Sequence, residues 1–377
     1  MQVQQRIRNA GAWTVQGECD ASQAQLVLAF TSAAQLRDAA VWQQLRTFYP
    51  KARIVGCSTA GEIAGTRVLD DSLVVTAVAF ATSQVALAAV LLNEVLDDVA
   101  RGKLLAARLP HFGLVHLMVL SDGLRVNGSA LLTGLLSELP AHVAVTGGLS
   151  ADGDRFERTA VCLDAPAPAE QIVAIGFYGE GLRIGYGCLG GWDPFGPERR
   201  ITHSSGNVLH QLDHEPALDL YKRYLGEHAQ GLPATGLLFP LAIRKSAEAA
   251  VVRTILAVDE TARTLTFAGD MPVGYRARLM RANFERLVDG ASEAAKISRL
   301  GNGGTDSQLA VLISCVGRKL VLKQRIEEEV EAVRDVLGPH TVMTGFYSYG
   351  EISAFTPAAR CELHNQTMTI TTFAERQ

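Results

Sequence analysis

The sequence lacks the features that mark membrane, secreted and nucleic-acid-binding proteins. No apolar run is long enough to cross a bilayer core of about 30 Å. The first residues lack the basic and then apolar order of a secretory signal. The net charge is −4, so there is no excess of positive charge to hold nucleic acid or an acidic membrane surface. We therefore expect a cytoplasmic protein with no membrane span and no nucleic-acid partner.

Cysteine is sparse and irregularly spaced. The 377 residues include six cysteines and no CxxC pair, a pattern that favours reduced thiols over disulfides. Hydrophobic residues make up 48% of the chain and charged residues 20%, which is the balance of a globular protein. A chain of this length usually exceeds one hydrophobic core, so we expect two domains.

What the sequence does contain is a repeat. GCSTAGEI at residues 56–63 reappears as GFYSYGEI at residues 345–352, and a weaker copy, GGLS, stands at residues 147–150. Each copy ends a strand-helix-strand pattern and is followed by a further strand. The expected strands are 26–31, 53–57 and 73–80, then 114–120, 143–146 and 172–177, then 309–315, 341–346 and 367–373. The expected helices are 34–48, 127–139 and 320–337. The β-α-β order implies a parallel strand pair in each unit.

These units predict an α/β protein with mixed sheets, built from repeated β-α-β-turn-β units as two related halves. A β-rich segment around residues 182–290 is inserted between the second and third copies, and it contains a short helix at 217–225. The loop at 190–197 is rich in glycine and proline and marks a candidate boundary. The predicted domains are therefore residues 26–190 and 191–373.

Two motifs resemble known binding sites but lack the context that those sites need. GYGCLG at residues 185–190 fits a dinucleotide fingerprint, yet glycines and prolines follow it instead of a helix. His210 and His214, with His203 upstream, would share a face only on a helix, and the residues around them favour a strand and a turn. Neither a nucleotide site nor a metal site is therefore expected here.

Several small polar residues could serve as nucleophiles. None of them sits in a Gly-x-Ser-x-Gly elbow or has a general base identifiable by spacing. A hydroxyl beside a glycine more often caps a turn. We therefore expect no enzymatic activity, with a hydrolase as the least supported alternative. The residues in question are Ser58, Ser150, Ser348, Cys57 and Cys315.

Glu62 and Glu351 occupy matching positions in the two strong copies of the turn. A carboxylate there either braces the backbone of a neighbouring loop or lines a ligand cleft, since α/β sheets bind ligands at the carboxyl ends of their strands. Bracing is the favoured interpretation. A single cleft formed by the two turns is the alternative.

The segment CELHNQTMTI at residues 361–370 places a histidine in apolar surroundings. If these residues form one strand, His364 shares a face with Met368 and Ile370. A neutral imidazole with one free nitrogen is what haem iron requires of a proximal ligand. From this residue alone, a histidine satisfied within the core is the favoured interpretation.

Taken together, these motifs resemble the FIST sensory proteins, which have an N-terminal and a C-terminal FIST domain. The resemblance covers residues 26–373, with the motifs in the family order. The motifs are GCSTAGEI, GGLSADG at 147–153, VGR at 316–318, GFYSYGEI and HNQT at 364–367.

The resemblance implies an intracellular sensor that binds a small ligand and signals to a partner enzyme. Because the chain has no kinase or cyclase segment, it is similar to the stand-alone FIST proteins, which include nitric-oxide-sensing haem proteins (NosP type). On this resemblance we expect haem b as cofactor, nitric oxide as ligand, and a histidine kinase or cyclic-di-GMP enzyme as partner. A homodimer is compatible with the repeats.

Of the nine histidines, only His364 lies in a family motif. The resemblance therefore assigns iron ligation to His364, with Glu351 and Met368 beside it as cofactor-binding residues. The alternative is a FIST sensor without haem, in which the glycine turns hold a small organic ligand such as an amino acid.

Overall fold

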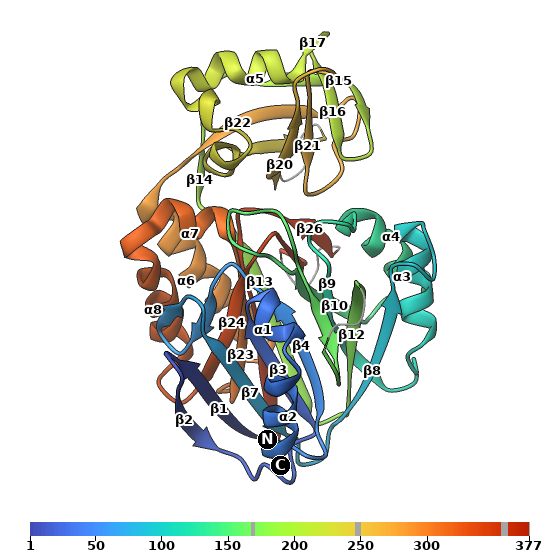
Figure 1. The fold of residues 1–377 in the computed structure, drawn as a ribbon, viewed down its shortest axis with the longest axis vertical. Helices are drawn as coiled ribbons and strands as arrows, with labels where there is room; N and C mark the ends of the chain where they lie inside the picture. The colour runs from blue at the N-terminus through green and yellow to red at the C-terminus, as the bar shows by residue number, and fades with distance from the viewer. Residues whose placement is uncertain (167–169, 246–249, 356–360, 377) are drawn as a thin grey trace.

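A computed structural model describes residues 1–166, 170–245, 250–355 and 361–376. Three six-stranded sheets and their helices form a body, and a lobe with a nine-stranded sheet lies over one end of it (Figure 1). We call this lobe, residues 192–282, the cap. Both chain termini lie at the opposite end of the body (Figure 1). The predicted α/β class is confirmed.

The same strand triplet recurs in each sheet of the body. A central strand pairs in parallel with the strand after the connecting helix, and antiparallel with the last strand of the unit. The triplets are β3 (Leu26–Thr31), β4 (Arg53–Ser58) and β7 (Leu73–Ala79); β9 (Leu114–Ser121), β10 (Ala144–Leu149) and β12 (Gln171–Tyr178); and β23 (Leu309–Cys315), β24 (Val342–Ser348) and β27 (Met368–Glu375). A third unit of the same topology therefore accompanies the two related halves. It is the second unit along the chain, and its turn is the copy least similar in sequence to the other two.

The turn after each parallel pair sends a short strand into a neighbouring sheet. β5 (Glu62–Ala64) of the first unit pairs with β24 of the third. β25 (Gly350–Ser353) of the third unit pairs with β10 of the second, and β11 (Val161–Leu163) of the second pairs with β4 of the first. Each sheet therefore contains a strand from another unit, and the three units close into a ring.

Further strands extend the sheets at their edges. β1, β8 and β13 precede their units in the chain and pair with β7, β12 and β27 respectively. The residues before the first unit thus form an edge hairpin of β1 and β2. The strands added in this way are β1 (Gln2–Asn9), β2 (Ala12–Glu18), β6 (Arg67–Leu69), β8 (Gln84–Leu91), β13 (Leu182–Leu189) and β26 (Glu362–His364), with β1 lying between β7 and β2.

The inner faces of the three sheets meet in one apolar core. Phe30 of the first sheet packs against Phe346 of the third, with ring centroids 4.9 Å apart, and Phe177 of the second packs against Phe373 of the third at 5.0 Å. Helices cover the outer faces, so the central strands are buried on both sides and read as apolar runs. The covering helices are α1 (Ala33–Arg37), α2 (Ala39–Phe48), α3 (Asp98–Ala107), α4 (Gly128–Glu138), α6 (Phe284–Gly301), α7 (Val316–Leu322) and α8 (Ile326–Leu337).

Two of the predicted helices are interrupted. The helix expected at 34–48 breaks at Asp38, whose extended backbone lets its side chain accept a hydrogen bond from Ala40 N at 2.9 Å and cap α2. The helix expected at 320–337 breaks at Lys323, which has a positive φ of 50° and opens the turn η3 (Lys323–Arg325). Among the described residues, none of the helices has both the length and the apolar character that a bilayer crossing needs.

The inserted β-rich segment is confirmed, but it is shorter than the predicted residues 182–290 because β13 and α6 belong to the body. The cap holds α5 (Ala217–Leu225) at the predicted place. Its other elements are β14 (Trp192–Pro194), β15 (Arg199–Ser205), β16 (Val208–Leu212), β17 (Glu215–Pro216), η1 (Gly226–Gly231), η2 (Ala234–Leu238), β18 (Leu241–Arg244), β19 (Val251–Arg253), β20 (Ile255–Asp259), β21 (Thr264–Phe267) and β22 (Arg276–Ala282).

The close approach of β9 and β10 requires glycine at position 147. An added Cβ at Gly147 would lie 1.9 Å from the carbonyl oxygen of Val119. We expect Gly147→Ala to lower the free energy of unfolding by about 3 kcal/mol, as measured by urea denaturation. Gly338 is the control, because its φ is also positive but its Cβ would meet nothing within 4 Å. Gly338→Ala should cost about 1 kcal/mol. Equal losses in the two variants would contradict the steric explanation.

Candidate functional site

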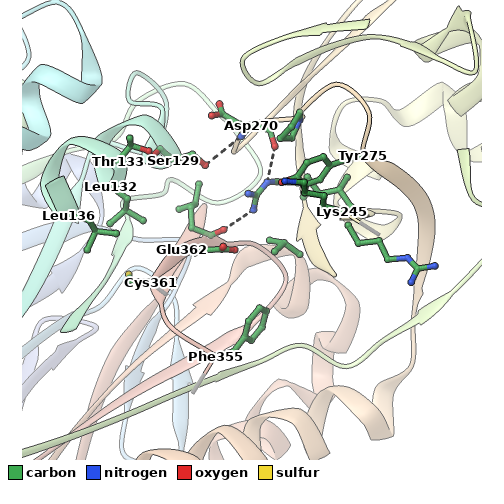
Figure 2. A pocket seen from close by; sticks show the side chains of 16 residues that line it. Ser129, Leu132, Thr133, Leu136, Lys245, Asp270, Tyr275, Phe355, Cys361 and Glu362 are labelled. Carbon is green, nitrogen blue, oxygen red and sulfur yellow. Dashed lines mark hydrogen bonds between the residues drawn. The ribbon is translucent and has the colours of Figure 1, made fainter. Parts of the chain in front are cut away.

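A cleft of about 510 Å³ lies where the cap meets the body. Its body wall comes from α4 and β26, and its cap wall comes from β18, β19 and the loop before β22. Figure 2 shows Leu132 and Leu136 of α4 on one side, with Asp270, Tyr275 and Lys245 of the cap on the other. The cleft therefore combines an apolar floor with polar groups contributed mainly by the cap.

Arg253, at the end of β19, is the most buried cation in the wall of the cleft, with 7% of its surface exposed. Its Nε donates to the carbonyl oxygen of Asp270 at 3.2 Å, and its Nη1 donates to the carbonyl oxygen of Leu363 at 2.7 Å. Both acceptors are neutral, and no carboxylate of the described residues forms an ion pair with this guanidinium. Burial lowers the pKa of Arg253 to about 10, so the side chain stays charged near neutral pH.

Some of the other charged groups of the cleft already have an ion-pair or hydrogen-bond partner within the protein. Arg244 forms an ion pair with Glu198 at 2.5 Å. Asp270 accepts a hydrogen bond from the side-chain amide of Asn127 at 2.8 Å, which ties the cap to the start of α4. Glu362 also lines the wall. The cleft thus offers carboxylates of its own beside a guanidinium whose charge no carboxylate balances directly.

His364 lies on β26 next to the cleft but outside its wall. The side chain is 1% exposed, and its Nε2 contacts the carbonyl oxygen of Ser353 at 2.9 Å. A carbonyl can only accept, so Nε2 carries the hydrogen, and Nδ1 has no partner among the described residues. Burial lowers the pKa of His364 to about 3, which keeps the ring neutral. Phe355, which does line the cleft, packs against the ring with centroids 4.2 Å apart.

The predicted shared face of His364 and Met368 is wrong. His364 ends β26, which pairs with β25 in the second sheet, whereas Met368 begins β27 in the third sheet. Between them, Gln366 has a positive φ of 64°, which breaks the alternation that one continuous strand would have. Met368 is fully buried and belongs to the hydrophobic core.

Glu351 braces two segments of the body. Its carboxylate accepts hydrogen bonds from the Ser348 hydroxyl at 2.5 Å and from the backbone N–H and hydroxyl of Thr367 at 3.2 and 2.9 Å. Its side chain is fully buried and lines neither the cleft nor the cavity described next. Burial raises the pKa of Glu351 to about 8, although the hydrogen bonds from Ser348 and Thr367 act in the opposite direction.

Glu62 makes the matching set of contacts in the first unit. It accepts hydrogen bonds from the Thr59 hydroxyl, and from the backbone N–H and hydroxyl of Ser72 at 3.1 and 2.7 Å. Burial raises its pKa to about 7. Glu62 also lines a second cavity of about 440 Å³, which Glu351 does not reach. The geometry is that of two equivalent braces, and the two turns do not meet in one cleft.

The remaining motifs have structural surroundings. GYGCLG lies within and just after β13. An added Cβ at Gly185 would lie 1.8 Å from the Ser298 carbonyl oxygen, so the glycine permits α6 to pack closely against β13. His203 and His210 lie on neighbouring strands with ring centroids 4.4 Å apart, as the strand-and-turn interpretation expects. Within the described ranges, no group of three or more histidine, cysteine or acidic residues is placed to hold a metal ion.

The candidate nucleophiles are enclosed in the body. Ser58 Oγ accepts a hydrogen bond from Ala160 N at 2.9 Å, and Ser348 Oγ donates to Glu351. Ser150 is fully buried. Burial raises the pKa of the Cys57 thiol well above its usual value and raises that of Cys315 as well, which disfavours the reactive thiolate.

Comparison with family models identifies a FIST N domain at residues 25–215 and a FIST C domain at residues 217–354. The chain belongs to the FIST family. FIST domains are sensory domains of signal transduction, so this FIST protein is a sensor. No match was found among curated proteins. Among solved structures, cyanuric acid hydrolase from A. caulinodans aligns over 95% of this chain and 92% of its own, with 10% identity and a TM-score of 0.36. A likeness so slight carries no argument about function.

The sequence motifs of this FIST protein do not include Arg253 or Asp270. One signal for Arg253 was present, because the pattern VVRTIL at 251–256 places a single charged residue inside an apolar strand. Its two partner groups lie 17 positions away, at Asp270, and 110 positions away, at Leu363, and only the fold brings them together.

The raised pKa of Glu351 makes the stability of this FIST protein depend on pH. Folding favours the protonated carboxyl, so its contribution to the free energy of unfolding is fully present below about pH 4.5 and is lost as the pH rises through about 8. We expect Glu351→Gln to flatten this dependence in urea denaturation between pH 5 and 9, by about 1.4 kcal/mol for each unit of pKa shift removed. Glu62 should leave a residual slope. An unchanged slope, equal to that of the exposed control Glu331→Gln, would contradict the assignment.

Proposed function

We propose that this FIST protein senses a small organic molecule that carries a carboxylate, and that this molecule binds in the cleft between cap and body. The proposal rests on Arg253, a buried guanidinium that faces only neutral hydrogen-bond acceptors. No carboxylate of the described residues forms an ion pair with this guanidinium, although Glu362 and Asp270 act on it at longer range. A ligand carboxylate in direct contact relieves the cost of burying the charge. Arginine is also suited to bind a carboxylate through two parallel hydrogen bonds.

The carboxylates in the cleft narrow the class of ligand. Asp270 and Glu362 lie in the same wall as Arg253 and favour a ligand that also carries a positive group. A free amino acid has both charges, and the apolar surface of Leu132 and Leu136 offers contact for its side chain. We therefore favour an amino acid, held in the cleft rather than by the glycine turns.

Because the cleft lies between cap and body, a ligand bound there can act as a signal without being chemically changed. A ligand that contacts both cap and body stabilises one arrangement of the two over another, to the extent that it binds that arrangement more tightly. The partner that reads the arrangement is, by resemblance to the family, a histidine kinase or a cyclic-di-GMP enzyme. The enclosed serines and cysteines described above support a non-enzymatic function.

Substitution of Arg253 tests the proposed function. A thermal-shift screen of the twenty L-amino acids should find at least one that raises the midpoint of unfolding, and calorimetry then gives its affinity. Arg253→Gln should weaken that affinity by about 10- to 100-fold, the worth of a charge-assisted hydrogen bond. Arg244→Gln is the matched control, because its charge is already balanced by Glu198. Binding that survives Arg253→Gln, or a screen without any hit, would overturn the proposal.

A second candidate function is a haem-based sensor of nitric oxide, and one observation favours it. The neutral ring of His364 directs no hydrogen bond through Nδ1, and its other nitrogen is held by Ser353, as in proximal haem ligands. The donor atom therefore fits. His364 borders neither the cleft nor the second cavity, and Phe355 packs against its ring, so Phe355 would have to move for haem to bind. Glu351 and Met368 are buried in structural contacts and are not free to receive a cofactor.

Absorption spectroscopy separates the two candidates. If haem is the cofactor, hemin added to the purified protein should produce a bound Soret band that shifts with nitric oxide. His364→Ala should then alter the spectrum, whereas the exposed His340→Ala should not. Phe355→Ala should increase haem uptake by opening the ring to the cleft. A protein that stays colourless after hemin addition, or an unchanged spectrum in His364→Ala, would exclude this candidate.

A further inference from the structure

Residues 363–367 connect three parts of the molecule: the second sheet, the third sheet and the cap. They leave β26 in the second sheet, cross to β27 in the third sheet, and touch the cap on the way. We call these residues the crossing segment. Residues 364–367 are the HNQT motif, and each is at most 3% exposed.

The crossing segment is attached to the cap by four hydrogen bonds in addition to the one from Arg253. The Asn365 side-chain oxygen accepts from Thr254 N at 3.3 Å. Gln366 Nε2 donates to the Leu237 carbonyl oxygen at 2.9 Å and to Thr254 Oγ1 at 3.1 Å. Trp192 Nε1 donates to the Gln366 carbonyl oxygen at 2.9 Å. These partners come from three separate parts of the cap, including the residue next to Arg253.

The same segment is attached to the turn that carries Glu351. The side-chain amide of Asn365 donates to the Tyr349 carbonyl oxygen at 3.1 Å, and Thr367 donates twice to Glu351. Tyr349 N in turn donates to the Leu149 carbonyl oxygen at 3.2 Å in the second unit. Asn365 and its two neighbours thus join the cap to the point where β25 crosses between units.

Gln366 is strained, and it is held by the cap on one side and by Gly317 of the body on the other. Its φ of +64° lies in the left-handed region, which costs a residue with a side chain of order 1 kcal/mol or more. Its Oε1 is buried without a partner among the described residues. The side chain also fits only because position 317 is glycine, whose added Cβ would lie 2.3 Å from Gln366 Nε2. A strained residue held from two sides is suited to report a change on either side.

We propose that the crossing segment couples the position of the cap to the Glu351 turn, and so carries the state of the cleft into the body. That the coupled state is ligand occupancy rests on the function proposed above. The coupling itself rests on the contacts of Thr254 with Asn365 and Gln366, and on those of Asn365 and Thr367 with the turn, and it operates without a ligand. By thermodynamic reciprocity, a change at the turn must affect the cap as strongly as a change in the cap affects the turn.

Hydrogen exchange of the full chain without ligand tests this coupling. Thr254→Ala removes the hydroxyl that Gln366 contacts, and we expect amides at residues 348–352 to exchange at least fivefold faster, although the substitution lies in the cap. Glu351→Gln should in turn speed exchange at residues 251–255. Asp270→Ala is the control, because it breaks a different contact between cap and body, with Asn127, and should leave residues 348–352 unchanged.

The outcomes separate this proposal from the proposed function. If Thr254→Ala affects only cap peptides, the coupling is absent, whether or not an amino acid binds. If the turn responds but no amino acid binds, the coupling stands and the assigned ligand is wrong. Thr254→Ser, which keeps the hydroxyl, should restore exchange to the original rate. Should Thr254→Ala not fold, Thr254→Val keeps the side-chain shape and gives the same readout.

Discussion

The exchange of short strands among the three sheets is the constraint on which the body depends. β5, β11 and β25 each leave their own unit and supply backbone hydrogen bonds to another. A unit folded alone would expose one sheet edge and project one unpaired strand, and both leave buried polar groups without partners. The ring therefore forms as a whole. The buried carboxylates of Glu62 and Glu351 hold the turns from which two of these strands depart.

Much of this architecture follows from local sequence, because its strands are short, apolar and bounded by clear signals. The strand 309–315 and the helix 217–225 are found where the sequence predicts them, the helix set between Pro216 and Gly226. Local sequence signals did not predict the structure where the role of a polar residue depends on the folded protein. The sequence predicts Asp38 as one more position of a continuous helix, but in the structure it ends α1 and caps the start of α2. Nothing in the sequence around Gln366 states that a polar residue there takes a left-handed conformation, because that conformation depends on Gly317 and on the cap.

The candidate site likewise combines features that are visible in the sequence with features that only the fold determines. The HNQT motif stands out in the sequence, but its geometry could not be deduced, because the alternation of a single strand does not apply to residues that belong to two sheets. Arg253 belongs to no motif, and only the fold shows that its hydrogen bonds go to neutral carbonyl oxygens and that none of the described carboxylates forms an ion pair with it. The motif and the arginine prove to be neighbours, joined by the bond from Arg253 to Leu363. The family motif lies next to the cleft, and the residues that line the cleft on both sides were found only from the structure.

The cap is joined to the body in an unusual way, since its first and last strands lie side by side. Trp192 pairs with Ala282, so the chain enters and leaves the cap through adjacent positions of one antiparallel pair. Because the two covalent connections lie together, the rest of the cap is held against the body by non-covalent contacts, among them the hydrogen bonds of Arg253, Thr254 and Asp270. The adjacent connections also make the lobe modular, because a loop of a few residues between positions 191 and 283 would close the gap. The insertion of the cap therefore interrupts none of the strand pairings that close the ring beneath it.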